Sequence, residues 1–132
     1  MSKTIFSKII EGEIPSYKIY ETPHVYAFLD IHPVQEGHVL VVPKVAVEDF
    51  TELPEPFYTE LFQVARRIAQ AQAKVFGKAR STLSVLGFDV PHVHVHVIPA
   101  DQASDIAFGQ SLTLSSEDFL RIQKQLIDQL AA

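Results

Sequence analysis

Residues 91–99 read Pro91-His92-Val93-His94-Val95-His96-Val97-Ile98-Pro99. Successive side chains of a β-strand point to opposite faces. A strand over 91–98 would therefore place three imidazoles on one face, about 6–7 Å apart. The valines between them would form the opposite face, which we expect to pack on the core. A proline at each end is expected to limit the strand. This alternation predicts a core strand that displays a row of histidines.

The row of histidines has three interpretations. The first is a set of polar side chains on a solvated strand, although nothing structural requires three imidazoles in register. The second is a zinc site, because His-x-His on a strand can hold zinc and a catalytic zinc takes three protein ligands. No cysteine is present to complete such a site, and Asp101 lies beyond Pro99, past the expected end of the strand. The third is a nucleophile that attacks phosphorus.

Attack on phosphorus suits a neutral imidazole. Its reference pKa is about 6.5, so one ring nitrogen can attack while the other keeps its proton and is held by an acceptor. No lysine or arginine lies between Arg80 and Arg121, and the chain has no Walker-type glycine loop. An anionic phosphate on this strand would therefore have to be neutralised by histidines and backbone N–H groups.

Composition and charge narrow the class of protein. The chain has 132 residues, an ordinary length for one domain, and 47% of them are hydrophobic. A formal net charge of −5 gives no general attraction for nucleic acid or an acidic membrane. No apolar run approaches the roughly 20 residues that span a bilayer, and the polar N-terminus does not resemble a signal peptide. The absence of cysteine excludes disulfides and thiol nucleophiles and fits a cytoplasmic protein.

The remaining pattern predicts an α+β fold with an antiparallel sheet. The longest predicted helix covers 56–76, where apolar residues recur at helical spacing between Pro56 and Gly77. A C-terminal helix is expected over 116–130, with Ser115 and Asp118 forming a capping box. The other expected elements are a short helix or turn at 4–11, strands at 17–21, 24–29, 38–42, 80–86 and 91–98, and a surface loop at 100–114.

With these residues in view, the chain resembles the histidine-triad superfamily, whose motif is His-φ-His-φ-His-φ-φ with φ apolar. Residues 92–98 match it throughout. Residues 4–15, 26–33 and 37–44 are similar to the corresponding segments of its nucleoside-phosphoramidase branch. The resemblance covers about 4–99 of a single domain spanning 1–132. It implies the histidine-triad fold, with 100–132 as a C-terminal loop and helix.

The resemblance also implies a function and a set of roles. His94 would attack the α-phosphorus of a nucleotide conjugate and form a nucleotidyl-histidine, and His96 would hold the phosphate oxygens and the bridging position. His92 and His38 would form a hydrogen-bonded pair on adjacent strands. Asp30 would bind both ribose hydroxyls. The base pocket would be lined by Ile5, Phe6, Phe28 and Ile31. The implied protein is a homodimeric hydrolase or nucleotidyl transferase of a small purine ribonucleotide conjugate, without a cofactor or metal.

The chain departs from the family pattern in two places. Many relatives carry Cys-x-x-Cys near the N-terminus, where this chain has Thr4 and Ser7, so we expect no structural zinc there. Many relatives also have a polar, glycine-rich loop before the first triad histidine, whereas residues 83–91 are shorter and apolar, with one carboxylate at Asp89. The leaving group stays open between an amine, a second nucleotide and a sugar phosphate. Two alternatives also stay open: a metal-dependent hydrolase with the triad as ligands, and a nucleotide-binding protein with little turnover.

Overall fold

Five strands form one antiparallel sheet in the computed structural model, which describes residues 3–132. The strands are β1 (Lys18–Glu21), β2 (Val25–Leu29), β3 (Val39–Pro43), β4 (Arg80–Ser84) and β5 (Val95–Ala100). They lie in the order β1-β2-β3-β5-β4, so β3 and β5 are neighbours although about 50 residues separate them in sequence. The predicted α+β fold with an antiparallel sheet is confirmed.

The two faces of the sheet carry different sets of side chains. On β5, Val95 and Val97 face the main core, as the alternation predicts, and His96 between them faces the other side. The same alternation runs along β2 and β3. The second face carries a smaller apolar cluster of Phe6, Ile9, Tyr26, Phe28, Leu40 and Val42. Both faces are buried, so these strands carry apolar residues on either side of the sheet.

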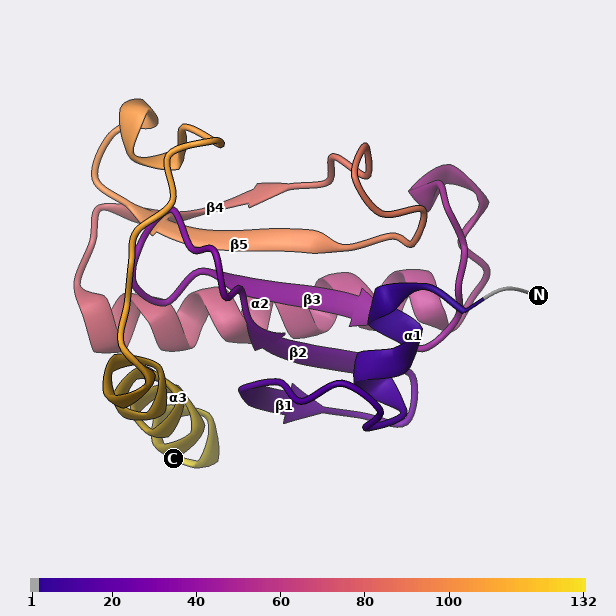
Figure 1. The fold of residues 1–132 in the computed structure, drawn as a ribbon, viewed down its shortest axis with the longest axis horizontal. Coiled ribbons are helices and arrows are strands. Elements are labelled where there is room, and N and C mark those ends of the chain that lie inside the picture. The colour runs from indigo at the N-terminus through magenta and orange to yellow at the C-terminus, as the bar shows by residue number, and fades with distance from the viewer. Residues whose placement is uncertain (1–2) are drawn as a thin grey trace.

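Helices cover both faces (Figure 1). The long helix α2 (Phe57–Phe76) and the C-terminal helix α3 (Ser116–Ala131) pack on the main core, and the short α1 (Ile5–Ile10) lies on the other face. Gly77 ends α2 in the left-handed conformation, and Ser115 with Asp118 forms the predicted capping box of α3. Two short 3₁₀ helices, η1 (Phe50–Glu52) and η2 (Ala103–Ile106), lie in connections. None of the helices within 3–132 is long and apolar enough to cross a membrane.

The triad strand is shifted from its predicted position. It was expected over 91–98, but β5 covers Val95–Ala100, and His92 and His94 lie in the segment that leads into it. The register of β3 with β5, continued by two residues, would set Pro43 opposite Val93, and proline has no N–H to donate. Pro99 lies inside β5 and does not end it. Pro99 pairs with Ser81 of β4. On its other side it lies past Val39, the first residue of β3, so no strand there needs its missing N–H.

A buried glutamine fixes the start of β3 against β5. The Gln72 side chain of α2 is fully buried and donates to the carbonyls of Gly37 and Val97, each at 2.8 Å. Its oxygen accepts a hydrogen bond from the Ser81 hydroxyl at 2.7 Å. Gly37 itself has φ of +85°, and any Cβ at this position would overlap the Phe76 ring. These constraints set the position of the residue that follows, His38.

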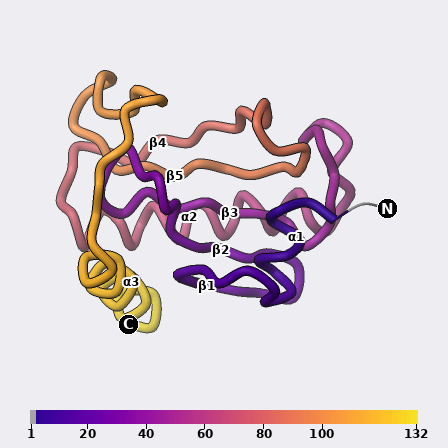
Figure 2. The backbone as a smooth tube through the Cα atoms, in the orientation of Figure 1, coloured from indigo at the N-terminus to yellow at the C-terminus, as the bar shows by residue number. Residues whose placement is uncertain are grey.

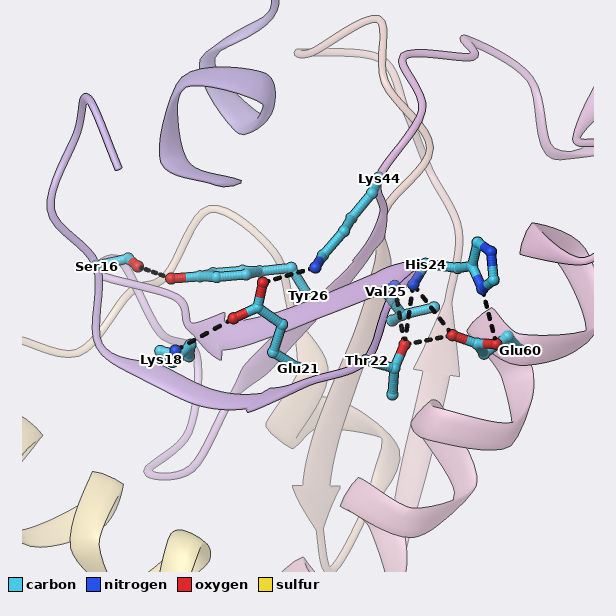
Figure 3. A network of polar contacts seen from close by, with 9 residues as sticks. All are labelled: Ser16, Lys18, Glu21, Thr22, His24, Val25, Tyr26, Lys44 and Glu60. Carbon is cyan, nitrogen blue, oxygen red and sulfur yellow. Dashed lines mark hydrogen bonds and ion pairs between the residues drawn. The ribbon is translucent and has the colours of Figure 1, made fainter. Parts of the chain in front are cut away.

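A polar network ties the β1–β2 hairpin to its neighbours (Figure 3). Glu60, in the first turn of α2, accepts hydrogen bonds from the Thr22 hydroxyl and from the backbone and side chain of His24. On the other side of the hairpin, Glu21 pairs with Lys44 at 2.6 Å. His24 was assigned no function from the sequence, and its contacts in the structure are those of a hairpin anchor.

Candidate active site

A cavity of about 460 Å³ lies between α1 and the second face of the sheet. Seven of the nine predicted site residues line it, and they are Ile5, Phe6, Phe28, Asp30, Ile31, His94 and His96. The other two, His38 and His92, are buried behind the wall, each with 1% of its surface exposed. The structure therefore brings seven of the predicted residues to one cavity and buries the other two behind its wall.

In its neutral form, His94 presents a ring nitrogen that carries no proton. Its Nδ1 lies 2.7 Å from the backbone oxygen of His92, and a carbonyl oxygen can only accept. Nδ1 must therefore carry the proton, which leaves the lone pair on Nε2. Because the ring lines the cavity, this is the arrangement that a nucleophilic imidazole requires.

His96 has the opposite tautomer, and the cause is a backbone amide. The N–H of Val34 donates to Nδ1 of His38 at 3.1 Å, so the proton of His38 is on Nε2. That Nε2–H donates to Nδ1 of His96 at 3.0 Å. The proton of His96 is consequently on Nε2, where it can donate to a ligand in the cavity. One triad ring thus offers a lone pair and the next offers a proton.

The predicted pairing of His92 with His38 is wrong. His92 Nε2–H donates to the carbonyl of Pro43 at 2.9 Å, and its Nδ1 accepts a hydrogen bond from the Thr4 hydroxyl at 2.7 Å. The reason is the direction of β3: His38 precedes its first residue and Pro43 is its last, so the two histidines lie at opposite ends of that strand. His38 instead supports His96.

Thr4 is a partner of the triad that sequence reasoning did not find. Its side-chain oxygen also accepts from the backbone N–H of Ser7, which makes Thr4 the N-cap of α1. One hydroxyl therefore joins the triad to the helix that carries Phe6. The capping role could have been read from the sequence, whereas the contact with His92, 88 residues away, could not.

Burial keeps the supporting imidazoles neutral. It lowers the pKa of His38 to about 4. Burial, together with the neighbouring His38 and His94, lowers the pKa of His96 to about 4. Burial also lowers the pKa of His92. Near pH 7 these rings therefore act as neutral donors and acceptors in the tautomers described above.

Asp30, at the end of β2, has one oxygen engaged and one near the triad. Its Oδ1 accepts from the backbone N–H of His32 at 2.8 Å, which is the turn contact expected before a His-Pro sequence. Its Oδ2 lies 3.5 Å from Nε2 of His38, and the residue lines the cavity. Asp30 therefore stabilises a turn and is also placed to accept from a ligand.

Asp30, His38 and His96 could be read as a metal site, because one possible ligand atom from each lies within 4.8 Å of the others. A neutral histidine that binds a metal through Nε2 carries its proton on Nδ1, where an acceptor holds it. Here Nδ1 of His38 faces the Val34 N–H, which is a donor. Both ring nitrogens of His92 are also used by protein groups. The donor set of these residues therefore does not fit a metal ion.

Phe108 and Asp89 are among the other residues that line the cavity, and neither was assigned a role from the sequence. Phe108 lies in the connection between η2 and α3, the orange path of Figure 2, and its ring centroid is 4.9 Å from that of His96. Asp89 lies in the segment just before the triad. Asp89 could be noticed in the sequence as a carboxylate in an apolar loop. No pattern in the sequence marks Phe108, because it lies in a stretch without periodicity.

The aromatic side chains form a row across the site. The ring of Phe6 packs edge-on against His94 at 4.8 Å, His94 against His96 at 5.1 Å, and His96 against Phe108 at 4.9 Å. The rings of His94 and His96 thus lie between two apolar ends. None of the cavity-lining residues within 3–132 is a lysine or an arginine, so an anion bound there would meet imidazoles.

Comparison with known proteins gives consistent matches. The HIT domain family model matches residues 11–103. Adenosine 5'-monophosphoramidase HNT1 of Saccharomyces cerevisiae is 36% identical over 129 residues, covering 96% of this chain and 82% of that protein. The asymmetrical bis(5'-nucleosyl)-tetraphosphatase of Schizosaccharomyces pombe is 38% identical over 103 residues, or 74% of this chain and 55% of that protein. The crystal structure of a Hit-like protein from Bartonella henselae superposes with a TM-score of 0.84 at 27% identity, covering 96% of both chains.

Proposed function

The chain belongs to the HIT domain family, and we propose that it is a hydrolase of nucleotide conjugates that cleaves them at the α-phosphorus. Its relatives include an adenosine monophosphoramidase and a dinucleoside tetraphosphatase, which supports nucleotide hydrolysis as the activity. The observation that carries the proposal further is the tautomer of His94. Its Nδ1–H is held by a carbonyl, and its Nε2 lone pair is left for attack.

The reaction takes two steps. In the first, Nε2 of His94 attacks the α-phosphorus, and the bond to the leaving group breaks with its electron pair moving to the leaving atom. An amine leaving group takes up one proton, which comes from solvent by way of Nε2 of His96. The other product is a nucleotidyl-histidine. Splitting the displacement in this way replaces one difficult step with two easier ones.

In the second step, water attacks the same phosphorus. The bond between phosphorus and His94 breaks, and its electron pair returns to Nε2. One proton of the water is released to solvent, which balances the proton taken up before. The net reaction consumes one water and releases the leaving group and a nucleoside monophosphate.

The rest of the nucleotide fits the apolar end of the cavity. Phe6 and Phe28 pack edge to face with centroids 5.9 Å apart and offer apolar ring surface to a purine base, with Ile5 and Ile31 at the rim. A carboxylate is acceptor-only, so Asp30 suits the two hydroxyl donors of a ribose. We therefore propose a purine ribonucleotide conjugate as the substrate.

A covalent adduct provides the test. Rapid quench of the protein with an adenosine phosphoramidate, followed by mass spectrometry, should find the nucleotidyl group on residues 92–96. His94→Ala should lose activity by several orders of magnitude while still binding adenosine monophosphate. Asp128→Ala, on the exposed side of α3 and outside the cavity, serves as a control with full activity. A loss of less than about tenfold would overturn the assignment. Nucleotide binding without any turnover would identify the chain as a binding protein.

We also propose that the chain is a homodimer. The edge strand β4 and the segment after it expose three large apolar side chains, namely Leu83, Leu86 and Phe88, the last with 92% of its surface exposed. An unpaired edge beside exposed apolar groups favours contact with another chain. Sedimentation at micromolar concentration should give a dimer, and Leu83→Lys should shift it toward monomer. A wild-type protein that stays monomeric would refute the proposal. A cytoplasmic location stays a prediction from the sequence.

A further inference from the structure

We propose that Asp89 and Phe108 form the subsite for the leaving group, and that they make the enzyme select conjugates with a cationic amine over those with a polyphosphate. The inference rests on the proposed function. It concerns the part of the substrate beyond the α-phosphorus, for which the sequence left three chemical classes open.

The row of rings gives the direction in which the substrate lies. The base occupies the end formed by Phe6 and Phe28, and the phosphorus lies at His94 and His96. The conjugate then continues past His96, where the next ring is Phe108. Asp89 lines the same cavity. Burial lowers the pKa of His96 and the charge of Asp89 partly opposes this, so the carboxylate lies within electrostatic range of the triad.

Charge then decides between the leaving groups. A polyphosphate brings several negative charges, and none of the lining residues that the structure describes is a lysine or arginine to meet them. Asp30 holds a turn through Oδ1 and, in the proposed function, accepts from the ribose, so Asp89 is the other carboxylate of the lining that is available to a leaving group. Its charge repels a polyphosphate and attracts an ammonium group.

Phe108 adds an apolar surface that a ligand in the cavity can reach. Its side chain is 42% exposed, so part of the ring is open to the cavity while its contact with His96 is kept. Two hydrogen bonds hold its segment in place: Leu112 N–H to the Pro33 carbonyl at 2.6 Å, and the Gln35 side chain to the Asp105 carbonyl at 3.1 Å. An aromatic face binds both alkyl chains and ammonium groups, which are the two parts of a cationic amine.

Kinetics on three adenosine monophosphate conjugates tests the inference. The first carries a cationic diamine as leaving group, the second a neutral amine of equal length, and the third is a diadenosine polyphosphate. The wild-type kcat/KM should fall in that order. Asp89→Asn should reduce the ratio of the first to the second by at least about fivefold and raise the polyphosphate value. Asp128→Asn, which removes a charge from the exposed side of α3, should leave all three unchanged.

Each outcome has a distinct meaning. If all three conjugates are cleaved and their ratios in Asp89→Asn match the wild type within about twofold, the charge selection is wrong and the proposed function stands. Phe108→Ala should lower kcat/KM for both amines without changing their ratio, and unchanged values would remove Phe108 from the subsite. If no conjugate is cleaved and no adduct forms on the triad, the proposed function fails and this inference fails with it.

Discussion

Acidification from about pH 7.5 to about pH 5 should destabilise the folded protein by about 4 kcal/mol, because His38 and His96 must stay neutral in the fold. Burial lowers the pKa of each to about 4, against an unfolded value of 6.5. The unfolded chain therefore binds more protons between these values, and the stabilisation is lost as the pH falls through 6.5 toward 4. The full stabilisation is present above pH 6.5.

The magnitude follows from proton linkage. A group with those two pKa values loses about 2 kcal/mol between the two conditions, and two such groups lose about 4 kcal/mol. Carboxylates held by hydrogen bonds contribute little in this range. Glu60, for example, has its pKa lowered by hydrogen bonds from Thr22 and His24, and its unfolded value is 4.5. Its stabilising effect is lost mainly below the window.

Urea unfolding at the two pH values measures the difference directly. His38→Gln should remove about half of the pH dependence. A wild-type difference below about 1 kcal/mol would refute the reasoning, since it would mean that the fold accepts a proton on this pair at little cost.

Three further predictions concern single substitutions and one concerns metal. Thr4→Val removes the hydroxyl that caps α1 and donates to His92, so it should lower the free energy of unfolding by about 2 kcal/mol. Thr4→Ser keeps the hydroxyl and should cost less than about 1 kcal/mol. A valine variant as stable as the wild type would contradict the contact with His92. Gly37→Ala should cost at least about 2 kcal/mol in the same assay, because of the positive φ and the overlap with Phe76. The wild type should prefer ribose to deoxyribose by roughly 10- to 150-fold, and Asp30→Asn should shrink that ratio; an unchanged ratio with lower thermal stability would leave Asp30 only its turn. Exhaustive chelation should leave activity intact, and activity lost to chelation and restored by zinc would refute the metal-free mechanism.

The alternation of residues 92–98 was enough to predict which side chains face the core and which face the site. Val95 and Val97 pack beneath α2, and His96 faces the cavity, because the period of a strand is independent of its partners. Resemblance to the family supplied what alternation could not. It identified Phe6 and Asp30, which lie far from the triad in sequence and next to it in space.

The errors have a common origin in groups that carry no sequence pattern. The start of β5 depends on Pro43 of the neighbouring strand, and the partner of His92 is a carbonyl, so neither could be found from the triad segment itself. Phe108 reaches the site through an irregular connection whose path depends on contacts such as that between Leu112 and Pro33. Periodicity predicts regular elements and is silent about such segments.

The main-chain groups that set the tautomers also affect how the site would tolerate mutation. The amide of Val34 and the carbonyls of Pro43 and His92 are present whatever side chains those positions carry. Alanine scanning would therefore leave all three intact, and only a proline at position 34 would delete one of them. Transplanting the site to another scaffold would accordingly require copying the path of the backbone. Four grafted histidines alone would lack the main-chain groups that set the tautomer of each ring.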